Sequence, residues 1–572
     1  MHDLIIRNGA VYDGTGAEPR IADIAIDGDR IVEIGAVTGA AREEIDAQGK
    51  IVTPGWVDIH THYDGQITWS ERITPSSTLG ATTVVVGNCG VGFAPVRPGD
   101  RDTLIRLMEG VEDIPGAALS EGLTWDWESF PEYMDAVDRH RRDIDVALQL
   151  PHGALRVYVM GERGARRAPA TEEENAQMRA LTAEAMRAGA LGFSTTRTMV
   201  HRTADGDLTP TVKAERAEME AIAAGLADAK SGVLQWVSDF RHMDDEFDLV
   251  RDMTKISGRP LSFTVVQADA VPNQWREQLT RLDALVADGH PIKAQIAGRP
   301  VGLLLGLQGS VNPFMNRPSW KDIDHLSLEE KVAVMRDPEF KARIISESPS
   351  KAHPFINSVA ASPHRMFPIG DTMDYEPHPE TSLAEEAARR GVTTDELVYD
   401  ALLEDGGRAF LFFPMHNYVH GDLGVVHDML VNPNTLYGLS DGGAHVGAIC
   451  DVSLPTFMLT YWCRDRERGP QLQLAEVIRR QSRETAEAVG LRDRGVLAPG
   501  YLADINVIDF DALTLGKPYM LYDLPTGARR LMQDASGYIA TIKSGQVIYR
   551  DGEATASLPG KLIRGEQAAP SN

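Results

Sequence analysis

Two histidines placed two residues apart are the strongest candidates for chemistry in this sequence. His60 and His62 end the apolar run WVDIHTH, residues 56–62. Side chains two apart on a strand project from the same side, so two imidazoles there can hold one metal ion. The carboxyl end of a strand is also where β/α barrels carry their active sites. The pair therefore predicts a metal site, against the alternative of two hydrogen-bonded histidines without a ligand.

Two more residues follow apolar runs in the same way. Asp441 ends TLYGLSD, residues 435–441, where a carboxylate could bind a metal and shuttle a proton, although many Asp residues before Gly-Gly only form turns. Cys89 follows TTVVVGN, residues 82–88, and a thiolate suits zinc, whereas a buried unreactive cysteine is the alternative. We predict that Asp441 is the general base and that four residues bind the metal: His60, His62, Cys89 and Asp441.

A serine hydrolase can be excluded at the same place. The segment from Gly438 to Gly442 fits the G-x-S-x-G nucleophile elbow, which needs an acid and then a histidine later in the chain. After Ser440 the only histidine is His445, which follows too soon for that order of triad residues.

Eight short apolar runs, alternating with amphipathic helical segments, must position these residues. Alternation of this kind indicates repeated βα units, so we predict an α/β fold with a (β/α)8 TIM barrel. Thr171 and Glu174 fit a capping box that opens one of the helices. The predicted strands are 56–62, 82–88, 145–153, 190–196, 233–240, 261–267, 292–298 and 435–441.

Both ends of the chain have the pattern of small antiparallel sheets. Alternating apolar runs flank turns at Asp27-Gly28 and Ser544-Gly545. We predict that residues 1–55 and 495–555 form one small β-sandwich domain, and that residues 56–494 form the barrel between them. The stretch at about 299–380 is too long for a barrel loop, so we expect a lid-like insertion over the active face.

Composition and charge limit the other possibilities. The 572 residues are 43% hydrophobic and 24% charged, which excludes a disordered chain. The net charge of −26 disfavours nucleic acid and anionic lipid as partners. No signal peptide or membrane-length apolar run is present, so we expect a cytoplasmic protein without a membrane partner. Three cysteines exclude a disulfide framework, and the expected partner is a small molecule, with a homo-oligomer left open.

Six segments carry a resemblance to a known family: IIRNGAVYDGTG, TPGWVDIHTHYDG, TTVVVGNCGVGFAPV, HGALR, GLSDGGAH and RGVLAPGYLADINVID. Together they resemble the amidohydrolase superfamily, and within it the N-acyl-D-amino-acid deacylase (D-aminoacylase) group, over nearly the whole chain. The resemblance implies a metal-bearing barrel that hydrolyses a C–N amide bond. By position it gives ligand roles to the same four residues and places His152 near the site.

The sequence departs from that family on two strands. Members usually carry one histidine each on strands five and six, but VLQWVSDF and LSFTVVQ contain none. The lysine expected to follow strand six for the substrate carboxylate is replaced by Val-Gln-Ala. We therefore expect one metal ion per chain rather than two. Polar side chains that could take a substrate-binding or supporting role are Asp58, Arg197, His201, Asp239, His242 and Gln267.

The sequence thus predicts a hydrolase with one divalent ion, zinc, that cleaves an N-acyl (D-)amino acid or a related N-acylated compound. Asp441 would take and return the proton, and Asp58 would hold an imidazole tautomer. One alternative is a hydrolase of cyclic or bulkier amides, favoured by the missing lysine and by the aromatic residues Phe314, Trp320 and Phe355 of the insertion. Another is a non-catalytic barrel that has lost its metal.

Overall fold

The central element of the protein is a curled parallel sheet of eight strands that follow one another in chain order. The computed structural model describes residues 1–438 and 440–571, so Leu439, inside the eighth predicted strand, lies outside the described residues. Each of the eight predicted runs overlaps a strand of this sheet, and most of their residues are buried, as in parallel sheets. The first strand is shorter than predicted: it ends at Asp58, so His60 and His62 lie just beyond it. They are β6 (Trp56–Asp58), β7 (Ala81–Val86), β8 (Asp145–Pro151), β9 (Gly192–Arg197), β10 (Val233–Ser238), β11 (Leu261–Val265), β12 (Ile292–Ile296) and β16 (Thr435–Tyr437).

The first and eighth strands are joined just beyond their carboxyl ends. The amide of Asp441 donates a hydrogen bond to the carbonyl of His60 (3.1 Å), and the amide of His62 donates to the carbonyl of Gly442 (2.7 Å). The two edges of the curled sheet therefore meet where the predicted site residues follow the strands, in agreement with a TIM barrel.

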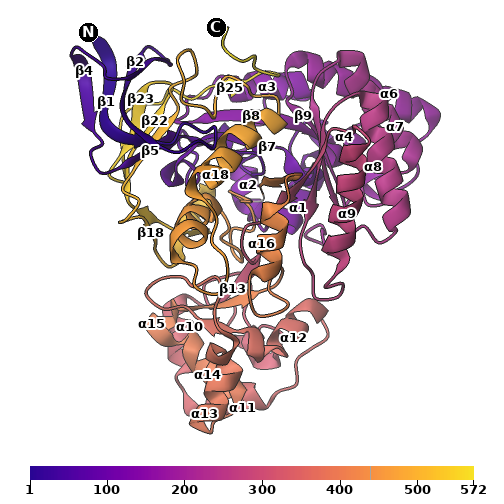
Figure 1. Ribbon diagram of the computed structural model, residues 1–572. Helices are drawn as coiled ribbons and strands as arrows, with labels where there is room; N and C mark the ends of the chain where they lie inside the picture. The colour runs from indigo at the N-terminus through magenta and orange to yellow at the C-terminus, as the bar shows by residue number, and fades with distance from the viewer. Residues whose placement is uncertain (439, 572) are drawn as a thin grey trace.

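Helices cover the outer face of the sheet, with the largest group on the right of Figure 1. The capping box predicted at the start of α6 is confirmed: Thr171 Oγ1 accepts from the Glu174 amide (3.2 Å), and the Glu174 carboxylate accepts from the Thr171 amide (2.8 Å). The helices are α1 (Arg101–Glu112), α2 (Gly116–Gly122), α3 (Phe130–Asp138), α4 (His152–Met160), α6 (Glu172–Ala188), α7 (Arg216–Ala229), α8 (Met243–Ser257), α9 (Gln274–Ala287), α16 (Gly424–Val431), α18 (Leu474–Arg479) and α19 (Thr485–Ala488).

Strands from both ends of the chain share a second sheet, at the upper left of Figure 1. The junction is the antiparallel pair of β5 and β17, and the turns predicted at Asp27-Gly28 and Ser544-Gly545 are confirmed. The separate β-sandwich domain stays a prediction. The strands are β1 (His2–Val11), β2 (Arg20–Asp27), β3 (Arg30–Gly35), β4 (Ala41–Asp46) and β5 (Ile51–Pro54) with β17 (Ile505–Ile508), β22 (Tyr538–Lys543), β23 (Gln546–Arg550) and β24 (Glu553–Ala554).

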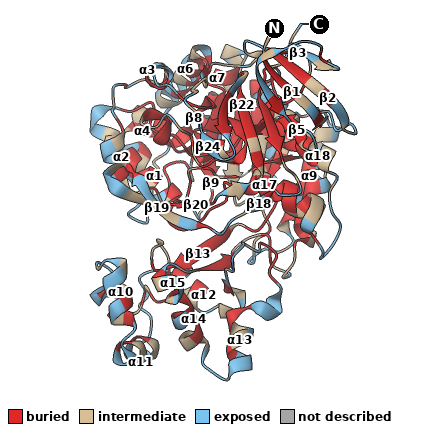
Figure 2. Cartoon of the chain, turned by 90° about the vertical axis from the view of Figure 1, so that its left-hand side faces the viewer, coloured by how far each residue is buried: buried red, intermediate tan, exposed pale blue. Residues whose placement is uncertain are grey.

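The long insertion forms a lobe below the barrel, with its own buried core (Figures 1 and 2). Its three-stranded sheet joins β13 (Gly302–Gly306), β15 (Phe410–Pro414) and β14 (Phe367–Pro368), so the lobe extends past the expected limit at about 380. Between these strands lie α10 (Leu328–Met335), α11 (Pro338–Ser346), α12 (Pro354–Ala360), α13 (Leu383–Arg390), α14 (Thr394–Leu402) and α15 (Glu404–Gly407).

The three aromatic residues expected to favour a bulky substrate have other surroundings in the insertion. Phe314 and Trp320 are buried in the core of the lobe, where the Phe314 ring lies edge-on to Tyr399 with 5.4 Å between ring centroids. Phe355 is 51% exposed on α12. The argument that these three aromatics favour a bulky substrate is therefore wrong, because the lobe is large enough to use its aromatics in its own core.

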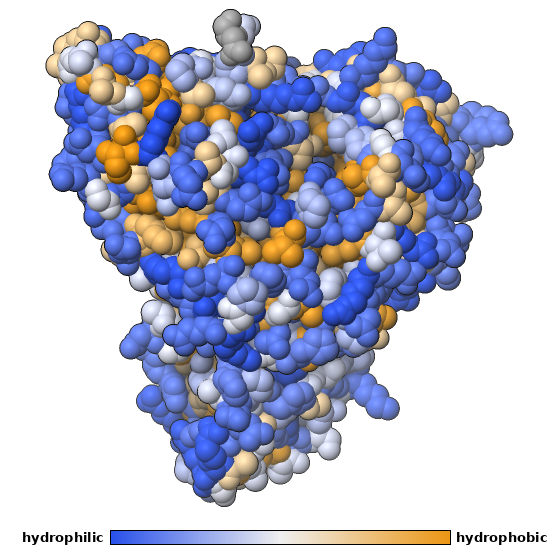
Figure 3. Space-filling model, in the orientation of Figure 1, coloured by the Kyte–Doolittle hydropathy of each residue, from blue (hydrophilic) through white to orange (hydrophobic). Residues whose placement is uncertain are grey.

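The face shown in Figure 3 is mainly hydrophilic, above all over the insertion, and its apolar patches lie on the upper body. Within residues 1–438 and 440–571, no helix combines the length and the apolar character that crossing a membrane requires.

Candidate metal centre and active site

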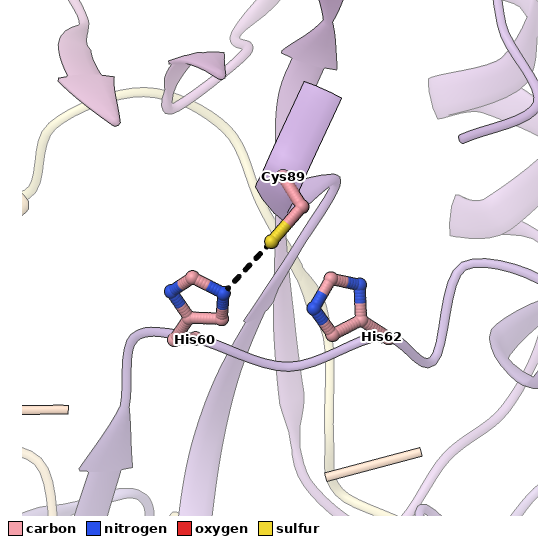
Figure 4. A group of neighbouring side chains, drawn as sticks. All are labelled: His60, His62 and Cys89. Carbon is pink, nitrogen blue, oxygen red and sulfur yellow. Dashed lines mark hydrogen bonds between the residues drawn. The ribbon is translucent and has the colours of Figure 1, made fainter. Parts of the chain in front are cut away.

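Three buried side chains meet at the carboxyl ends of the first two barrel strands (Figure 4). His60 and His62 follow β6, and Cys89 lies in the turn after β7. His60 Nε2 is 3.3 Å from Cys89 Sγ, and one donor atom from each residue lies within 4.8 Å of the others. Strand β10 helps to hold the turn, because the Cys89 backbone amide donates to Gln235 Oε1 (3.1 Å). Two nitrogens and one sulfur at this spacing form a donor set suited to zinc.

Asp441 adds a carboxylate to the same group. Its Oδ1 lies 3.5 Å from His60 Nε2 and 3.8 Å from His62 Nε2, so both imidazoles direct the same ring nitrogen toward it. The Asp441 side chain is 19% exposed, whereas both imidazoles are 1% exposed. The structure thus brings the four predicted residues together, with the carboxylate on the solvent side.

The outward ring nitrogens of the two histidines face different acceptors. His60 Nδ1 lies 2.8 Å from Gln295 Oε1, and the side-chain amide nitrogen of Gln295 donates to Ser262 Oγ (2.8 Å). His62 Nδ1 lies 3.2 Å from Oε1 of Glu112, the last residue of α1. Each imidazole is therefore flanked on its outer side by a residue that can set its tautomer.

Burial controls the charge of this site. It lowers the pKa of His60 to about 4 and the pKa of His62 well below its ordinary value, so both imidazoles are neutral, as metal ligands must be. Burial raises the pKa of Asp441 to about 7 and the pKa of the Cys89 thiol well above its usual value. A metal ion would therefore have to displace the thiol proton on binding.

A pocket adjoins His62 and Asp441, and most of its lining is apolar. One wall is the hairpin of β19 (Tyr519–Leu524) and β20 (Ala528–Met532). The pocket also contains Arg530, whose guanidinium is already paired with Asp523 at 2.6 and 2.7 Å. Apolar residues of the lining include Trp69, Ile114, Val446, Ile449, Leu524 and Leu531.

The structure places His152 and Arg197 in structural contacts instead of at the metal ligands. Both ring nitrogens of His152 are used, with Thr195 Oγ1 and Glu218 Oε1 each at 2.8 Å. Arg197 pairs with Glu246 (2.9 Å) and donates to the carbonyl of Ala214. Neither residue contacts the four predicted ligands in these hydrogen bonds, because each is held by a neighbouring helix or loop.

The remaining candidates after strands four, five and six differ in location. His201 lies near His62, whose pKa it helps to lower, and its Nδ1 is 3.0 Å from Thr196 Oγ1. Asp239 accepts from the Met199 amide (2.9 Å) and so holds the loop after β9. His242 is exposed at the start of α8. Gln267 is buried, and its backbone amide donates to Asn417 Oδ1 (2.8 Å).

Asp58 has a different partner from the one predicted. It accepts from the hydroxyl of Ser440 and from the backbone amide of His60 (3.3 Å). The Nδ1 atom of the His60 imidazole instead lies 2.8 Å from Gln295 Oε1. The prediction that Asp58 holds an imidazole tautomer is therefore wrong; Asp58 instead links the loops that follow the first and eighth strands.

Sequence reasoning missed Glu112 and Gln295 as neighbours of the histidines. A signal existed for Gln295, because a polar residue inside the apolar strand 292–298 needs a buried partner. The same signal marks Gln235 in β10. No local pattern singled out Glu112, whose position depends on how α1 packs.

Comparisons with known proteins place the chain in a family. The family model described as "Amidohydrolase family" matches residues 43–549. D-aminoacylase of Alcaligenes xylosoxydans xylosoxydans is 37% identical over 194 residues, which cover 34% of this chain and 37% of that protein. An uncharacterized protein of Mycobacterium tuberculosis is 27% identical over 96% of this chain and 92% of its own length.

Two solved structures share the fold. A D-aminoacylase structure has a TM-score of 0.65 and 24% identity, covering 99% of this chain and 100% of that one. An N-acyl-D-glutamate deacylase from Bordetella bronchiseptica, complexed with zinc and a phosphonate inhibitor, has a TM-score of 0.64 and 23% identity over 98% of this chain and 99% of that one. With the family match extending over most of its length, the chain belongs to the amidohydrolase family.

Proposed function

We propose that this amidohydrolase family member cleaves the C–N amide bond of an N-acyl (D-)amino acid or a related N-acylated compound, using one zinc ion per chain. The observation that carries the proposal is the convergence of His60, His62 and Cys89 beside Asp441. The deacylase names of the partial relatives and of the solved structures with the same fold support the reaction class.

The donor set fits the proposed ion. Two neutral imidazoles and the thiolate left when Cys89 loses its proton would supply three ligands, and these would leave a fourth position for water or substrate. A divalent ion held there lowers the pKa of water toward neutrality and polarises a carbonyl. Asp441, at 3.5 Å from the nearer imidazole, is proposed as a weak or distant ligand. The absence of histidine from strands five and six favours one ion over two.

Asp441 is proposed to move the proton. A carboxylate whose pKa lies at about 7 can take a proton from attacking water and return it to the leaving nitrogen at neutral pH. Its partial exposure leaves it accessible to substrate from the pocket beside His62. The backbone bond from the Asp441 amide to the His60 carbonyl fixes its distance from the metal ligands.

Metal analysis together with a substrate screen tests the proposal. Protein purified without chelators should contain close to one metal ion per chain, and both metal and activity should fall in His60→Ala and His62→Ala. A screen of N-acyl-D- and N-acyl-L-amino acids, read by amine release, should find turnover. Metal-free, inactive wild-type protein would support the alternative of a barrel without catalysis, and two ions per chain would overturn the mononuclear assignment.

A second candidate is a hydrolase of bulkier or cyclic amides that lack a carboxylate. The pocket favours it, because its lining is mainly apolar and its one arginine, Arg530, is already neutralised by Asp523. Neutral N-acyl amines in the same screen distinguish the two candidates: faster turnover of the neutral compounds would select this second candidate.

A further inference from the structure

Glu112 has a position that neither the helix nor the core explains. It is the last residue of α1, and only 1% of its surface is exposed. Oε1 lies 3.2 Å from His62 Nδ1, and Oε2 lies 3.9 Å from His445 Nε2. Among residues 1–438 and 440–571, no lysine or arginine pairs with this carboxylate. Its ion-pair partners are therefore two imidazoles, while the carboxyl groups of Asp64 and Asp441 also lie near enough to act on its charge.

The location is unfavourable for an acid in two ways. A carboxylate removed from water loses hydration that only close hydrogen bonds can replace. The carboxyl end of a helix also carries a partial negative charge, which repels an acidic side chain in the last turn. A non-acidic side chain at position 112 would avoid both costs, so the carboxyl group beside His62 Nδ1 indicates a role for its oxygen atoms as hydrogen-bond acceptors.

The two predicted ligand histidines are oriented alike, but a different residue lies beside the Nδ1 atom of each. Both direct Nε2 toward Asp441 and Nδ1 outward. The outer neighbour of His60 is the neutral amide of Gln295, which is itself hydrogen-bonded to Ser262. The outer neighbour of His62 is the Glu112 carboxylate. His62 Nδ1 has no hydrogen-bond partner although Glu112 Oε1 lies only 3.2 Å away, so the orientation of the two groups, and not their separation, is what a hydrogen bond between them still requires.

We propose that Glu112 is a positioning residue for His62. Its carboxylate accepts a hydrogen bond from Nδ1–H of His62, which selects the tautomer with a free Nε2 and makes that nitrogen a better donor to a metal ion. This inference rests on the metal centre proposed above. Glu112 positions His62 alone, because the Nδ1 atom of His60 already has Gln295 as its partner.

The test compares zinc affinity among variants of α1. Glu112→Gln should weaken zinc binding about 10- to 100-fold in a competition titration with a chromophoric chelator, the loss typical of an outer hydrogen-bond partner. Glu112→Asp, which keeps the charge but shortens the side chain, should recover part of that loss. Glu109→Gln is the matched control on the same helix, because Glu109 accepts a bond from the Gly116 amide and has no contact with His62; its zinc affinity should be unchanged.

A second readout separates positioning from a structural role. In excess EDTA, Glu112→Gln should melt no lower than wild type, because a buried acidic group near Asp64 and Asp441 is replaced by a neutral amide of the same size. A lower melting temperature with unchanged zinc affinity would overturn the proposal. In a double-mutant cycle, adding Glu112→Gln to His62→Ala should cause no further loss of zinc affinity, and additive losses would also overturn it. If the wild-type protein binds no zinc, the proposed function is overturned together with this inference. If the wild-type protein binds zinc tightly and Glu112→Gln leaves the affinity unchanged, only this inference is overturned.

Discussion

Asp441 combines the contacts and the accessibility that a proton-transferring carboxylate needs. It lies close to both histidines of the predicted ligand set, is partly exposed and has a pKa raised to about 7 by burial. We predict that Asp441→Asn lowers kcat by about 10² to 10⁴, the usual loss when a general base is removed. Metal content should stay near the wild-type value, because His60, His62 and Cys89 remain.

Steady-state kinetics and elemental analysis of the same preparation check this prediction. Near-normal turnover in Asp441→Asn would remove Asp441 from its role as base. Loss of the metal together with activity would instead assign Asp441 as a principal ligand.

Asp451 provides a test of charge burial outside the ligand set. Burial raises its pKa to about 7, although Arg299 at 3.2 Å lowers it, and Oδ2 has no hydrogen-bond partner. The folded state therefore binds a proton that the unfolded state releases between the ordinary value of 3.8 and about 7. This contribution to the free energy of unfolding should fall as pH rises through that window, by at most about 1.4 kcal/mol per pH unit, and then stay constant.

Urea unfolding across that pH range, in wild type and in Asp451→Asn, measures the effect. The variant should show a shallower fall of unfolding free energy with pH. Parallel curves for the two proteins would contradict the assignment to Asp451.

At the scale of elements, His152 connects the first turn of α4 to β9 and α7 by hydrogen bonds. It begins α4 and bonds both Thr195 on β9 and Glu218 on α7, and Arg156 of α4 pairs with the same carboxylate. All four side chains are buried. His152→Ala should lower the free energy of unfolding by about 3 kcal/mol, because breaking a buried, paired network leaves polar groups without partners.

The kcat of folded His152→Ala should match wild type, since the histidine has no contact with the ligand group. His325→Ala, at a position exposed in the insertion, is the control and should change neither quantity. A large fall in kcat with unchanged stability would return His152 to the active site.

The elements also show how far sequence reasoning could reach. The barrel strands were predictable because each is a short apolar run, and the order of parallel strands then places the residues that follow them at one end of the barrel. His60, His62, Cys89 and Asp441 all follow strands in this way. Glu112 does not, because it ends a helix and reaches His62 through the packing of α1, which no local pattern encodes.

Long-range pairing limited the prediction of the insertion in the same way. β15 returns to pair with β13 across the whole lobe, so its apolar run FLFFP gave no local sign that the insertion continued past residue 380. The aromatic residues Phe314 and Trp320 were assigned to substrate because sequence alone does not show that the lobe has its own core.

At the scale of the whole molecule, the two chain ends depend on each other. β5 lies between β1 and β17, and β25 (Leu562–Ile563) pairs with barrel strand β8. Removal of residues 500–572 should therefore expose the edge of β5 and unfold the N-terminal strands, since a half-sheet buries too little apolar surface to be stable. Far-UV circular dichroism and thermal melting of the truncated chain test this, and an unchanged melting curve would refute the idea of a shared β-domain.

The pairing of β5 with β17 also affects how the protein is made. During translation, Ile51 leaves the ribosome about 450 residues before Ile508, its partner in the sheet, which at about 5 to 20 residues per second is a delay of roughly 20 to 90 seconds. Throughout that time the nascent N-terminal strands present an unpaired apolar edge, the kind of surface on which aggregation starts. We therefore expect newly synthesised chains to depend on chaperones that shield this edge until the last strands emerge.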